Sequence, residues 1–513
     1  MNAPSARLGT GFHDGATHQG PLTLEADVVV VGSGAGGAVV AAILAEAGQR
    51  VLVLEEGRHV PQAEYGKLTP SQQMRAMWRD AGLTFAIGVG DSPVINVMMG
   101  KCVGGSSALT GGVCFRTPAN VLEAWRRDRG LPMFTEAHLE PFFEEVEQVV
   151  NVEEVPASLR SRSTLLFHEG ATKLGHPLKP MRRNTKGCEG NSKCNFGCPV
   201  GAKRSVDLSW LPRATALGAQ VWTHCLAERV THADGRANGV VGRLLNGDHG
   251  SPGTSFTVHA KRVVLAAGAY HTPLLAQASG IGRASGQVGR NLTLHPGFRV
   301  MGRFDEAVEG WRGALQSMYA DDWEADGITM TSLFLPPGVL AATMPGIGPK
   351  HVARARQMSQ LGAFGGMVHD EGGGVVRRGP GREPFVTYRM HEKDKAAVPK
   401  LMRLMADIWF SAGAKEVFLP VLGLGGVTPD RLRTLDLEHV KGRDLECGSQ
   451  HPLGTCRMGP SKETSVVDPY GECWDLPGCT IADGSVVPTS LGVNPQLTIM
   501  TMALRIARHL AEA

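Results

Sequence analysis

Between residues 26 and 54 the pattern of apolar positions predicts a strand, a helix and a second strand. Residues 26–31 contain four consecutive valines, a run typical of a buried strand. Residues 38–47 are apolar over a length that suits a helix, and residues 50–54 again have the composition of a strand. This order of elements is typical of an α/β protein with a parallel sheet.

The turn between the first strand and the helix has the spacing G-x-G-x-x-G, formed by Gly32, Gly34 and Gly37. Gly32 allows a sharp turn, Gly34 lets the backbone approach a pyrophosphate, and Gly37 lets the helix pack close to the sheet. The start of the helix offers free N–H groups and a partial positive charge to phosphates. Glu55 ends the second strand, where a carboxylate accepts hydrogen bonds from ribose hydroxyls. The segment therefore predicts a dinucleotide-binding site.

Beyond this unit the chain alternates helical and strand-like stretches with Gly- and Pro-rich loops. Helices are predicted over residues 118–150, 205–217, 396–409 and 496–510. From about residue 297 the pattern changes to alternating strand-like segments, such as residues 299–301 and 385–388. This change predicts a second domain with a different architecture.

Length and charge narrow the class of protein. With 513 residues the chain is too long for one compact core, so two domains are expected. The 52 basic and 49 acidic residues leave a formal charge of +3 without a basic block, so nucleic-acid binding is not indicated. The apolar run 28–44 contains the glycines of the turn and is not predicted to span a membrane. The absence of a signal-peptide pattern and the ten cysteines favour a cytoplasmic location.

Four further segments of the sequence carry motifs, in addition to the glycine fingerprint. They are residues 104–110 (GGSSALT), 268–282, 288–296 and a block from 451 to 495. Together the five segments resemble the glucose–methanol–choline (GMC) flavoprotein oxidoreductases over nearly the whole chain. Thr110 stands where that family usually has Asn, and Ala276 where it has an aliphatic residue. The motifs are similar to those of long-chain alcohol oxidases, cholesterol-oxidase-like members and catalytic subunits of FAD sugar dehydrogenases.

The resemblance implies an α/β fold with a non-contiguous, Rossmann-like FAD-binding domain. A second, α+β domain for the substrate is expected to be built on an antiparallel sheet. The expected organisation is a flexible arm (1–25), an FAD-binding domain (26–296) with insertions at 60–97 and 118–204, a substrate-binding domain (297–440), and a return to the FAD-binding domain with the catalytic residues (441–513).

FAD, rather than NAD, is the cofactor that the resemblance implies. A short predicted strand ends on Asp483, far in sequence from the fingerprint, and an NAD enzyme needs no such second carboxylate. The alternative for Asp483 is a turn-initiating residue before Gly484. Some relatives attach FAD to a His directly after the Gly/Ser run, but Ala108 stands here, so non-covalent FAD is expected. The predicted FAD contacts are Gly32, Gly34, Gly37, Glu55, Gly104, Gly105, Ser106, Ser107, Thr110, Asp483, Gly484 and Pro495.

His451 occupies the position of the family's catalytic base, inside the segment H-P-L-G-T. An imidazole suits this task because its pKa lies near working pH. Asn494 aligns with a position that holds His or Asn in the family, where it would bind the substrate oxygen. Asn494 before Pro495 is also a typical helix start, with Asn at the N-cap and Pro at the first helical position. Both roles remain open for Asn494.

Three cysteines, Cys188, Cys194 and Cys198, lie within eleven residues of a Gly-rich loop. Their spacing resembles the loop that holds a three-iron cluster in bacterial FAD sugar dehydrogenases, and also the Cys-rich loop of long-chain alcohol oxidases. A [3Fe-4S] cluster, structural thiols and a zinc site are the alternatives. With a cluster the enzyme would be a dehydrogenase of a sugar or polyol that passes electrons to a carrier protein. Without a cluster, oxygen or a quinone would accept them.

The predicted function is oxidation of an alcohol to an aldehyde or ketone, with proton abstraction at His451 and hydride transfer to the flavin N5. A hydrophobic alcohol is favoured because the second domain offers methionine and aromatic side chains rather than the polar groups that a sugar needs. Nine of these apolar residues are candidates for its substrate surface: Met301, Met318, Met330, Phe334, Leu335, Met344, Met358, Phe364 and Met367. A redox-silent lyase on the same fold is the alternative of another class.

Overall fold

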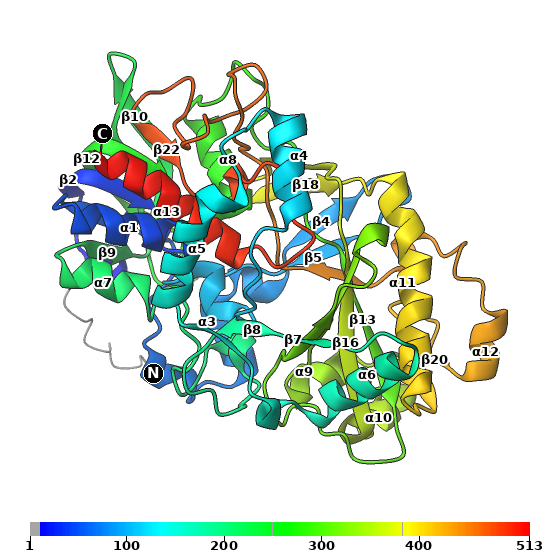
Figure 1. The fold of residues 1–513 in the computed structure, drawn as a ribbon. Coiled ribbons are helices and arrows are strands. Elements are labelled where there is room, and N and C mark those ends of the chain that lie inside the picture. The colour runs from blue at the N-terminus through cyan, green and yellow to red at the C-terminus, as the bar shows by residue number, and fades with distance from the viewer. Residues whose placement is uncertain (1–10, 249, 382, 513) are drawn as a thin grey trace.

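The computed structural model describes residues 11–248, 250–381 and 383–512. This part of the chain forms two large sheets, each with its own buried core. Figure 1 shows the first sheet, with β2 and β12, on the left and the second, with β13 and β16, on the right. Among the helices described, none combines the length and the apolar content needed to cross a membrane.

The first sheet has eight strands in the order β1-β9-β3-β2-β12-β11-β10, and β22 also pairs with β12. In this order, the pairs from β1 through β9, β3 and β2 to β12 are parallel, and β22 is also parallel to β12. Strands β10, β11 and β12 form an antiparallel meander. The bounds are β1 (Phe12–Asp14), β2 (Leu22–Val31), β3 (Val51–Leu54), β9 (Gln220–Thr223), β10 (Cys225–Ala233), β11 (Arg236–Leu245), β12 (Pro252–Leu265) and β22 (Cys479–Ile481). The pairing of β22 with the end of β12 brings the C-terminal block beside the fingerprint.

The predicted strand–helix–strand unit is confirmed as β2, α1 (Ala35–Glu46) and β3. Helix α1 is buried on all sides from Gly36 to Ala45, because it packs between the sheet and two other helices. These are α7 (Trp210–Ala216) and α13 (Gln496–Glu512), and α13 packs in turn against α5 (Glu136–Val149). A helix buried in this way needs no polar face, which explains its uniformly apolar sequence.

The second sheet has twelve strands in the order β17-β18-β4-β5-β21-β13-β16-β15-β14-β7, with β19 on β13 and β20 on β19. The bounds are β4 (Phe85–Gly88), β5 (Ile95–Val97), β7 (Lys179–Pro180), β13 (Gly297–Arg303), β14 (Met318–Ala320), β15 (Ile328–Ser332), β16 (Leu361–Val368), β17 (Gly374–Arg378), β18 (Pro384–Tyr388), β19 (Glu416–Phe418), β20 (Gly426–Val427) and β21 (Cys447–Ser449). Helices α6 (Arg162–Lys173) and α11 (Glu392–Ser411) pack against one another and on β16.

The remaining elements connect the two sheets or lie at the surface. They are β6 (Val152–Glu154), β8 (Arg182–Asn184), α2 (Gln62–Tyr65), α3 (Pro70–Met77), α4 (Ala119–Arg129), α8 (Gly268–Ala278), α9 (Pro337–Ala342), α10 (Pro349–Ala355) and α12 (Pro429–Thr434). The predicted helix 118–150 is divided into α4 and α5, because Gly130 ends α4 in the left-handed conformation. The predicted helix 205–217 is shorter, since α7 begins only at Trp210.

The structure departs from two predicted boundaries. Residues 12–14 pair with β9, and β2 begins at Leu22, so the described part of the predicted arm belongs to the first sheet. Residues 1–10 lie outside the described residues. The second sheet is not confined to residues 297–440, because β4, β5, β7 and β21 come from outside that range. These pairings join segments that are distant in sequence, and local patterns do not encode them.

Candidate active site

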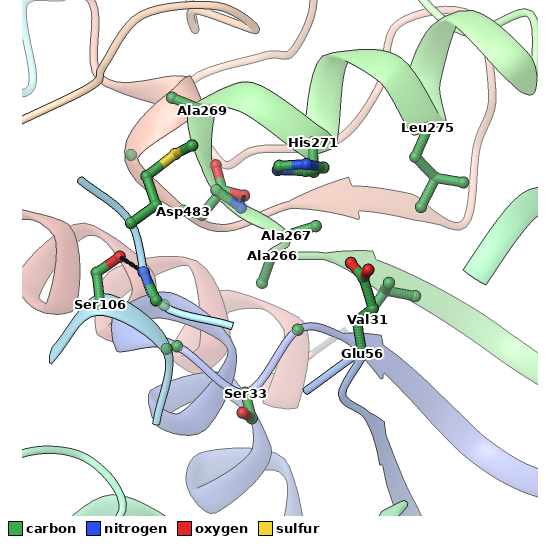
Figure 2. Close-up of a pocket in the computed structure, with 18 of the residues that line it drawn as sticks. Val31, Ser33, Glu56, Ser106, Ala266, Ala267, Ala269, His271, Leu275 and Asp483 are labelled. Atoms are coloured by element: carbon green, nitrogen blue, oxygen red, sulfur yellow. Dashed lines mark hydrogen bonds between the residues drawn. The ribbon is translucent and has the colours of Figure 1, made fainter. Parts of the chain in front are cut away.

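Of the fingerprint glycines, Gly32 and Gly34 line one end of a cavity of about 680 Å³ at the carboxyl ends of β2 and β3, whereas Gly37 does not line it. Figure 2 shows this cavity, with Ser33 at the fingerprint turn. Gly32 has φ +103°, and a Cβ there would lie 2.3 Å from the Ala266 carbonyl oxygen. A Cβ at Gly37 would lie 2.0 Å from the carbonyl oxygen of Gly32. At Gly34, in contrast, the nearest described atom to a Cβ would be Gly105 Cα, 3.9 Å away. Two of the glycines therefore allow close packing, and Gly34 keeps the cavity itself open.

The first turn of α1 faces this cavity without a side-chain cap. Gly34 is the N-cap residue, and no side chain in the described ranges caps the first N–H groups of the helix. Free N–H groups and the helix dipole form a site for an anion. The open space at Gly34 and the uncapped helix together fit the diphosphate of a dinucleotide.

Glu55 is buried between the fingerprint and the chain that follows β3. Its Oε2 accepts hydrogen bonds from Ser33 N (3.1 Å) and Ser33 Oγ (2.6 Å), and its Oε1 accepts one from Gly57 N (2.8 Å). Burial raises the pKa of Glu55, and these hydrogen bonds oppose the rise. Both Glu55 and Glu56 line the cavity, and Figure 2 shows the Glu56 carboxylate at its edge. The carboxylate that is predicted to bind the ribose is thus held in place by Ser33 of the fingerprint turn and by Gly57.

The segment 104–110 approaches the fingerprint from the opposite side. The Gly104 N–H donates to Ser33 Oγ (3.1 Å), and a Cβ at Gly105 would lie 2.9 Å from Gly34 Cα. Ser106 Oγ accepts from the Gly100 N–H (3.0 Å; Figure 2). Of the FAD contacts predicted in this segment, Gly105, Ser106 and Ser107 line the cavity, whereas Gly104 and Thr110 do not line it. Gly104 acts instead by joining the two Gly-rich turns.

Asp483 lies at the carboxyl end of β22, on the wall of the same cavity. Its carboxylate accepts hydrogen bonds from the Gly268 N–H (2.8 Å), Thr272 Oγ1 (2.5 Å) and the Ser485 N–H (2.7 Å). Burial raises its pKa, and these donors oppose the rise. Asp483 caps the turn at Gly484 and also lines the cavity beside Gly484, while its contact with FAD stays a prediction.

His451 and Asn494 meet where this cavity adjoins a second one. Asn494 Nδ2 lies 3.0 Å from His451 Nε2, and Asn494 Oδ1 is buried without a hydrogen-bond partner among the described residues. Burial lowers the pKa of His451 to about 4, so the ring is neutral at neutral pH and can accept a proton. The expected helix cap is not formed, because α13 begins at Gln496 and Pro495 accepts its first backbone hydrogen bond, from Ile499. Asn494 lines the second cavity, and its side-chain oxygen caps no N–H group of the helix among the described residues.

The second cavity, of about 570 Å³, lies against the second sheet and is largely apolar. It shares His451, Ser106, Ser107 and Pro495 with the first cavity, so the two adjoin at the histidine. Of the nine predicted substrate-facing residues, Phe334, Leu335 and Met367 line it. Met301 and Met344 belong instead to the core around Phe334, and the core of the second sheet contains Met318, Met330 and Phe364.

Two residues beside the histidine were not predicted. Gln496 Oε1 accepts a hydrogen bond from Thr110 Oγ1 (2.8 Å), and Gln496 Nε2 is buried without a partner in the part of the chain described. His295 Nε2 accepts from the Leu491 and Gly492 N–H groups, both at 3.0 Å, and its ring lies edge-on to His451 with 5.3 Å between centroids. The sequence signal for Gln496 was its partner Thr110, which stands where the family usually has Asn. The signal for His295 was the pair His295-Pro296.

The Cys-rich loop is arranged around buried positive charges rather than a metal. Arg183 Nη2 donates to Cys194 Sγ (2.9 Å), and Lys203 Nζ donates to the Cys194 carbonyl oxygen (2.8 Å). Burial opposes ionisation of the thiol, but the charges of Arg183 and Lys203 lower the pKa of Cys194. In the described ranges no group of three or more His, Cys, Asp or Glu side chains is placed to hold a metal ion. Cys188, Cys194 and Cys198 are thus not grouped as a metal site in these ranges, and the [3Fe-4S] cluster stays a prediction.

Comparison with family models matches two parts of the chain to one family. The N-terminal model described as GMC oxidoreductase matches residues 26–297, and the C-terminal model matches residues 378–503. A GMC-type oxidoreductase of Mycobacterium tuberculosis is 38% identical over 491 residues, which cover 95% of this chain and 76% of the relative. A long-chain-alcohol oxidase of Arabidopsis thaliana is 28% identical over 532 residues, which cover 95% of this chain and 67% of the relative.

Solved structures share the same fold. Pyridoxine 4-oxidase from Mesorbium loti superposes with a TM-score of 0.72 at 19% identity, over 95% of this chain and 99% of that chain. A formate oxidase superposes with a TM-score of 0.70 at 16% identity, over 95% and 98% of the two chains. The predicted fold class, a Rossmann-like FAD-binding domain with a second, substrate-binding domain, is confirmed.

Proposed function

The chain belongs to the GMC oxidoreductase family, and on this premise we propose that it oxidises a hydrophobic alcohol to an aldehyde or ketone. The observation that carries the proposal is the contact between Asn494 and His451 at the meeting point of the two cavities. A neutral imidazole can accept the hydroxyl proton, and an amide N–H group can donate to the oxygen that becomes negative.

FAD fits the first cavity. Gly34 leaves space for the diphosphate at the uncapped start of α1, and Glu55 has carboxylate oxygens for the ribose. The cavity also continues past Ser106 to His451, so a flavin ring can extend toward the base. Ala108 stands where some relatives carry a flavin-linked His, so the cofactor is held non-covalently. When bound, FAD supplies the acceptor for the hydride that leaves the alcohol carbon.

His451 takes the hydroxyl proton at Nε2. Its burial keeps the ring unprotonated at neutral pH, and the substrate hydroxyl takes the place of the Asn494 Nδ2 donor at this nitrogen. The Asn494 amide orients this nitrogen, and its Oδ1 has no other described partner. An amide can both accept from and donate to the substrate oxygen, so Asn494 steadies this oxygen as its negative charge develops.

The second cavity favours an apolar substrate. Phe298, Leu315, Leu333 and Phe334 belong to its walls, and sugars need more hydrogen-bonding partners than such walls provide. The relatives named as long-chain-alcohol oxidases are similar over most of this chain, which supports the same class of substrate.

Oxygen is the proposed acceptor of the electrons. The alcohol loses a proton to His451 and a hydride to FAD, and transfer of two electrons and two protons to oxygen gives hydrogen peroxide. Cys194 contacts Arg183, and the Cys loop has no metal-binding arrangement in the described residues, so the proposal does not pass electrons through an iron–sulfur cluster.

Anaerobic mixing with 1-decanol tests this function. The expected result is loss of the visible flavin absorbance, with one decanal formed per flavin, whereas decane, which lacks the hydroxyl, leaves the spectrum unchanged. Readmission of oxygen is expected to restore the absorbance and to yield hydrogen peroxide. Unchanged absorbance with every alcohol tested would favour a redox-silent lyase and overturn the proposal.

A further inference from the structure

The second cavity contains a charged side chain that the proposed reaction does not use. Arg299 lies on β13 and lines this cavity, while the neighbouring Phe298 also belongs to the core of the second sheet. Apolar side chains, among them Leu333 and Phe334, surround much of the same space. A guanidinium is always charged in proteins, and a charge in an apolar environment is costly unless a partner binds it.

The Arg299 side chain lacks such a partner. Its Nε is shielded from solvent and makes no hydrogen bond with any described residue. Burial lowers the pKa of Arg299, and the charge of Glu446 opposes this effect. Glu446 acts through its charge alone and is itself exposed, so it keeps its own hydration. A buried donor of the guanidinium is therefore free for a ligand.

Arg299 lines the same cavity as His451, and the strand register places the two residues apart. Gly297 pairs with Gly448, three residues before His451, and Arg299 follows Gly297 by two residues, or about 7 Å of strand. Gly365 lies directly opposite Arg299 on β16 and shares its face of the sheet. The missing side chain of Gly365 leaves room for Leu333, whose Cδ2 would lie 2.6 Å from a Cβ there, so an apolar wall of the cavity lies on the same face as Arg299.

We propose that Arg299 binds a carboxylate at the far end of the alcohol, so that the preferred substrates are hydroxy acids with an apolar chain between the two groups. This inference rests on the proposed function, in which His451 receives the hydroxyl end. Guanidinium and carboxylate match in a forked, charge-assisted geometry, and the apolar walls bind the methylene chain. Glu446 also lines this cavity, but the residue is exposed and water hydrates its carboxylate. It therefore does not require a cationic group on the substrate.

The test compares ω-hydroxydecanoate with 1-decanol, which differ only at the end distant from the reacting carbon. The purified FAD-loaded enzyme is expected to show a kcat/KM for ω-hydroxydecanoate at least ten-fold above that for 1-decanol. Arg299→Gln is expected to lower kcat/KM for the hydroxy acid by roughly ten-fold to one hundred-fold, the scale of a hydrogen bond to a charged group. The change is expected mainly in KM and is expected to exceed any change for 1-decanol, which has no carboxylate for Arg299 to bind.

Two further variants and an inhibitor complete the experiment. Arg299→Lys keeps the charge but not the forked geometry and is expected to retain part of the preference. Glu446→Gln removes a like charge and is expected to improve the KM for the hydroxy acid slightly. Decanoate, which has no hydroxyl to oxidise, is expected to compete with 1-decanol in the wild type and to bind at least ten-fold more weakly to Arg299→Gln.

The outcomes separate this inference from the proposed function. Turnover of 1-decanol with equal or poorer turnover of ω-hydroxydecanoate would overturn the role of Arg299 and leave alcohol oxidation standing. An equal loss for both substrates in Arg299→Gln and Arg299→Lys would assign Arg299 a structural role and also overturn it. A lack of flavin reduction by either compound would contradict the proposed function itself.

Discussion

Replacement of Gly34 by alanine separates cofactor binding from folding. Gly34 has φ −74° and ψ −165°, an extended conformation that alanine adopts without strain. The added Cβ would lie 3.9 Å from Gly105 Cα, an ordinary contact, so the protein itself accommodates it. At such a compatible position Gly→Ala stabilises a fold by about 0.4–1 kcal/mol, through the unfolded chain.

The same methyl group would enter the space that FAD requires at the start of α1. Forcing an extra methyl group into a filled site costs about 1–3 kcal/mol. If this cost falls on binding, Gly34→Ala weakens FAD binding by about five-fold to more than one hundred-fold. The expected variant is therefore at least as stable as the wild type without FAD, but poorly saturated with it.

Gly36→Ala is the matched control, two residues further along α1. A Cβ there would lie only 1.8 Å from the Ala482 carbonyl oxygen, and 3.1 Å from Asp483 Cα. These are backbone atoms of β22 and the turn after it, so α1 must move away from the segment that carries Asp483. Gly36→Ala is expected to destabilise the fold by 3 kcal/mol or more, roughly the upper end of overpacking costs.

Thermal unfolding at graded FAD concentrations measures both effects. The midpoint without added FAD reports the fold, and its rise with FAD reports affinity. For Gly34→Ala we expect an unchanged or higher midpoint without FAD and a smaller rise with it; for Gly36→Ala we expect a lower midpoint throughout. The reasoning is refuted if Gly34→Ala binds FAD with wild-type affinity, or loses as much stability without FAD as Gly36→Ala.

Three further predictions concern the titrating and polar groups. Because burial lowers the pKa of His451 to about 4, kcat/KM is expected to stay level from neutral pH to about pH 5 and to fall only near pH 4; an acid limb centred near 6.5 would contradict this. Burial alone would lower the pKa of His224, but hydrogen bonds to Asp14 and Asp248 raise it to about 9. This pair of contacts stabilises the fold fully below the unfolded pKa of about 6.5, and the stability is lost as pH rises through 9. The urea midpoint of unfolding is expected to fall between pH 6 and pH 10, and to fall further in the wild type than in His224→Asn. Equal falls in the two proteins would count against a stabilising role of His224. Asn494→Leu is expected to slow flavin reduction about ten-fold to one hundred-fold with FAD retained, the scale of one hydrogen bond to a charged group, and a wild-type rate in stopped flow would exclude its role.

Local patterns were sufficient for the parts of the site that neighbouring residues build. The strand, the glycine turn and Glu55 all lie within thirty residues, and the contacts of Glu55 with Ser33 and Gly57 are made inside this unit. The α/β class and the presence of a second domain follow from the same unit and from the change of pattern near residue 297, whereas the FAD-binding fold was implied by the resemblance to the family. Nothing in the local sequence indicated that Gly36 must be a glycine. A side chain at this position would collide with Ala482, which belongs to a distant segment of the chain.

The rest of the site depends on contacts that cross the molecule. Asn494 before Pro495 has the local pattern of a helix cap, but in the structure its amide contacts His451. Likewise, an arginine in a strand-like segment gives no sign that it faces a cavity, and only the pairing of β13 with β16 and β21 places Arg299 there. The interleaved second sheet was missed for the same reason.

The central claim is that His451 takes the proton while a hydride leaves the alcohol carbon. Anaerobic stopped-flow measurement of flavin reduction, with 1-decanol and its α-dideuterated form, tests it most directly in the wild type and His451→Gln. The account predicts slower reduction with the deuterated alcohol, and a loss of at least two orders of magnitude in His451→Gln with FAD still bound. Reduction of the His451→Gln flavin at the wild-type rate would contradict the account.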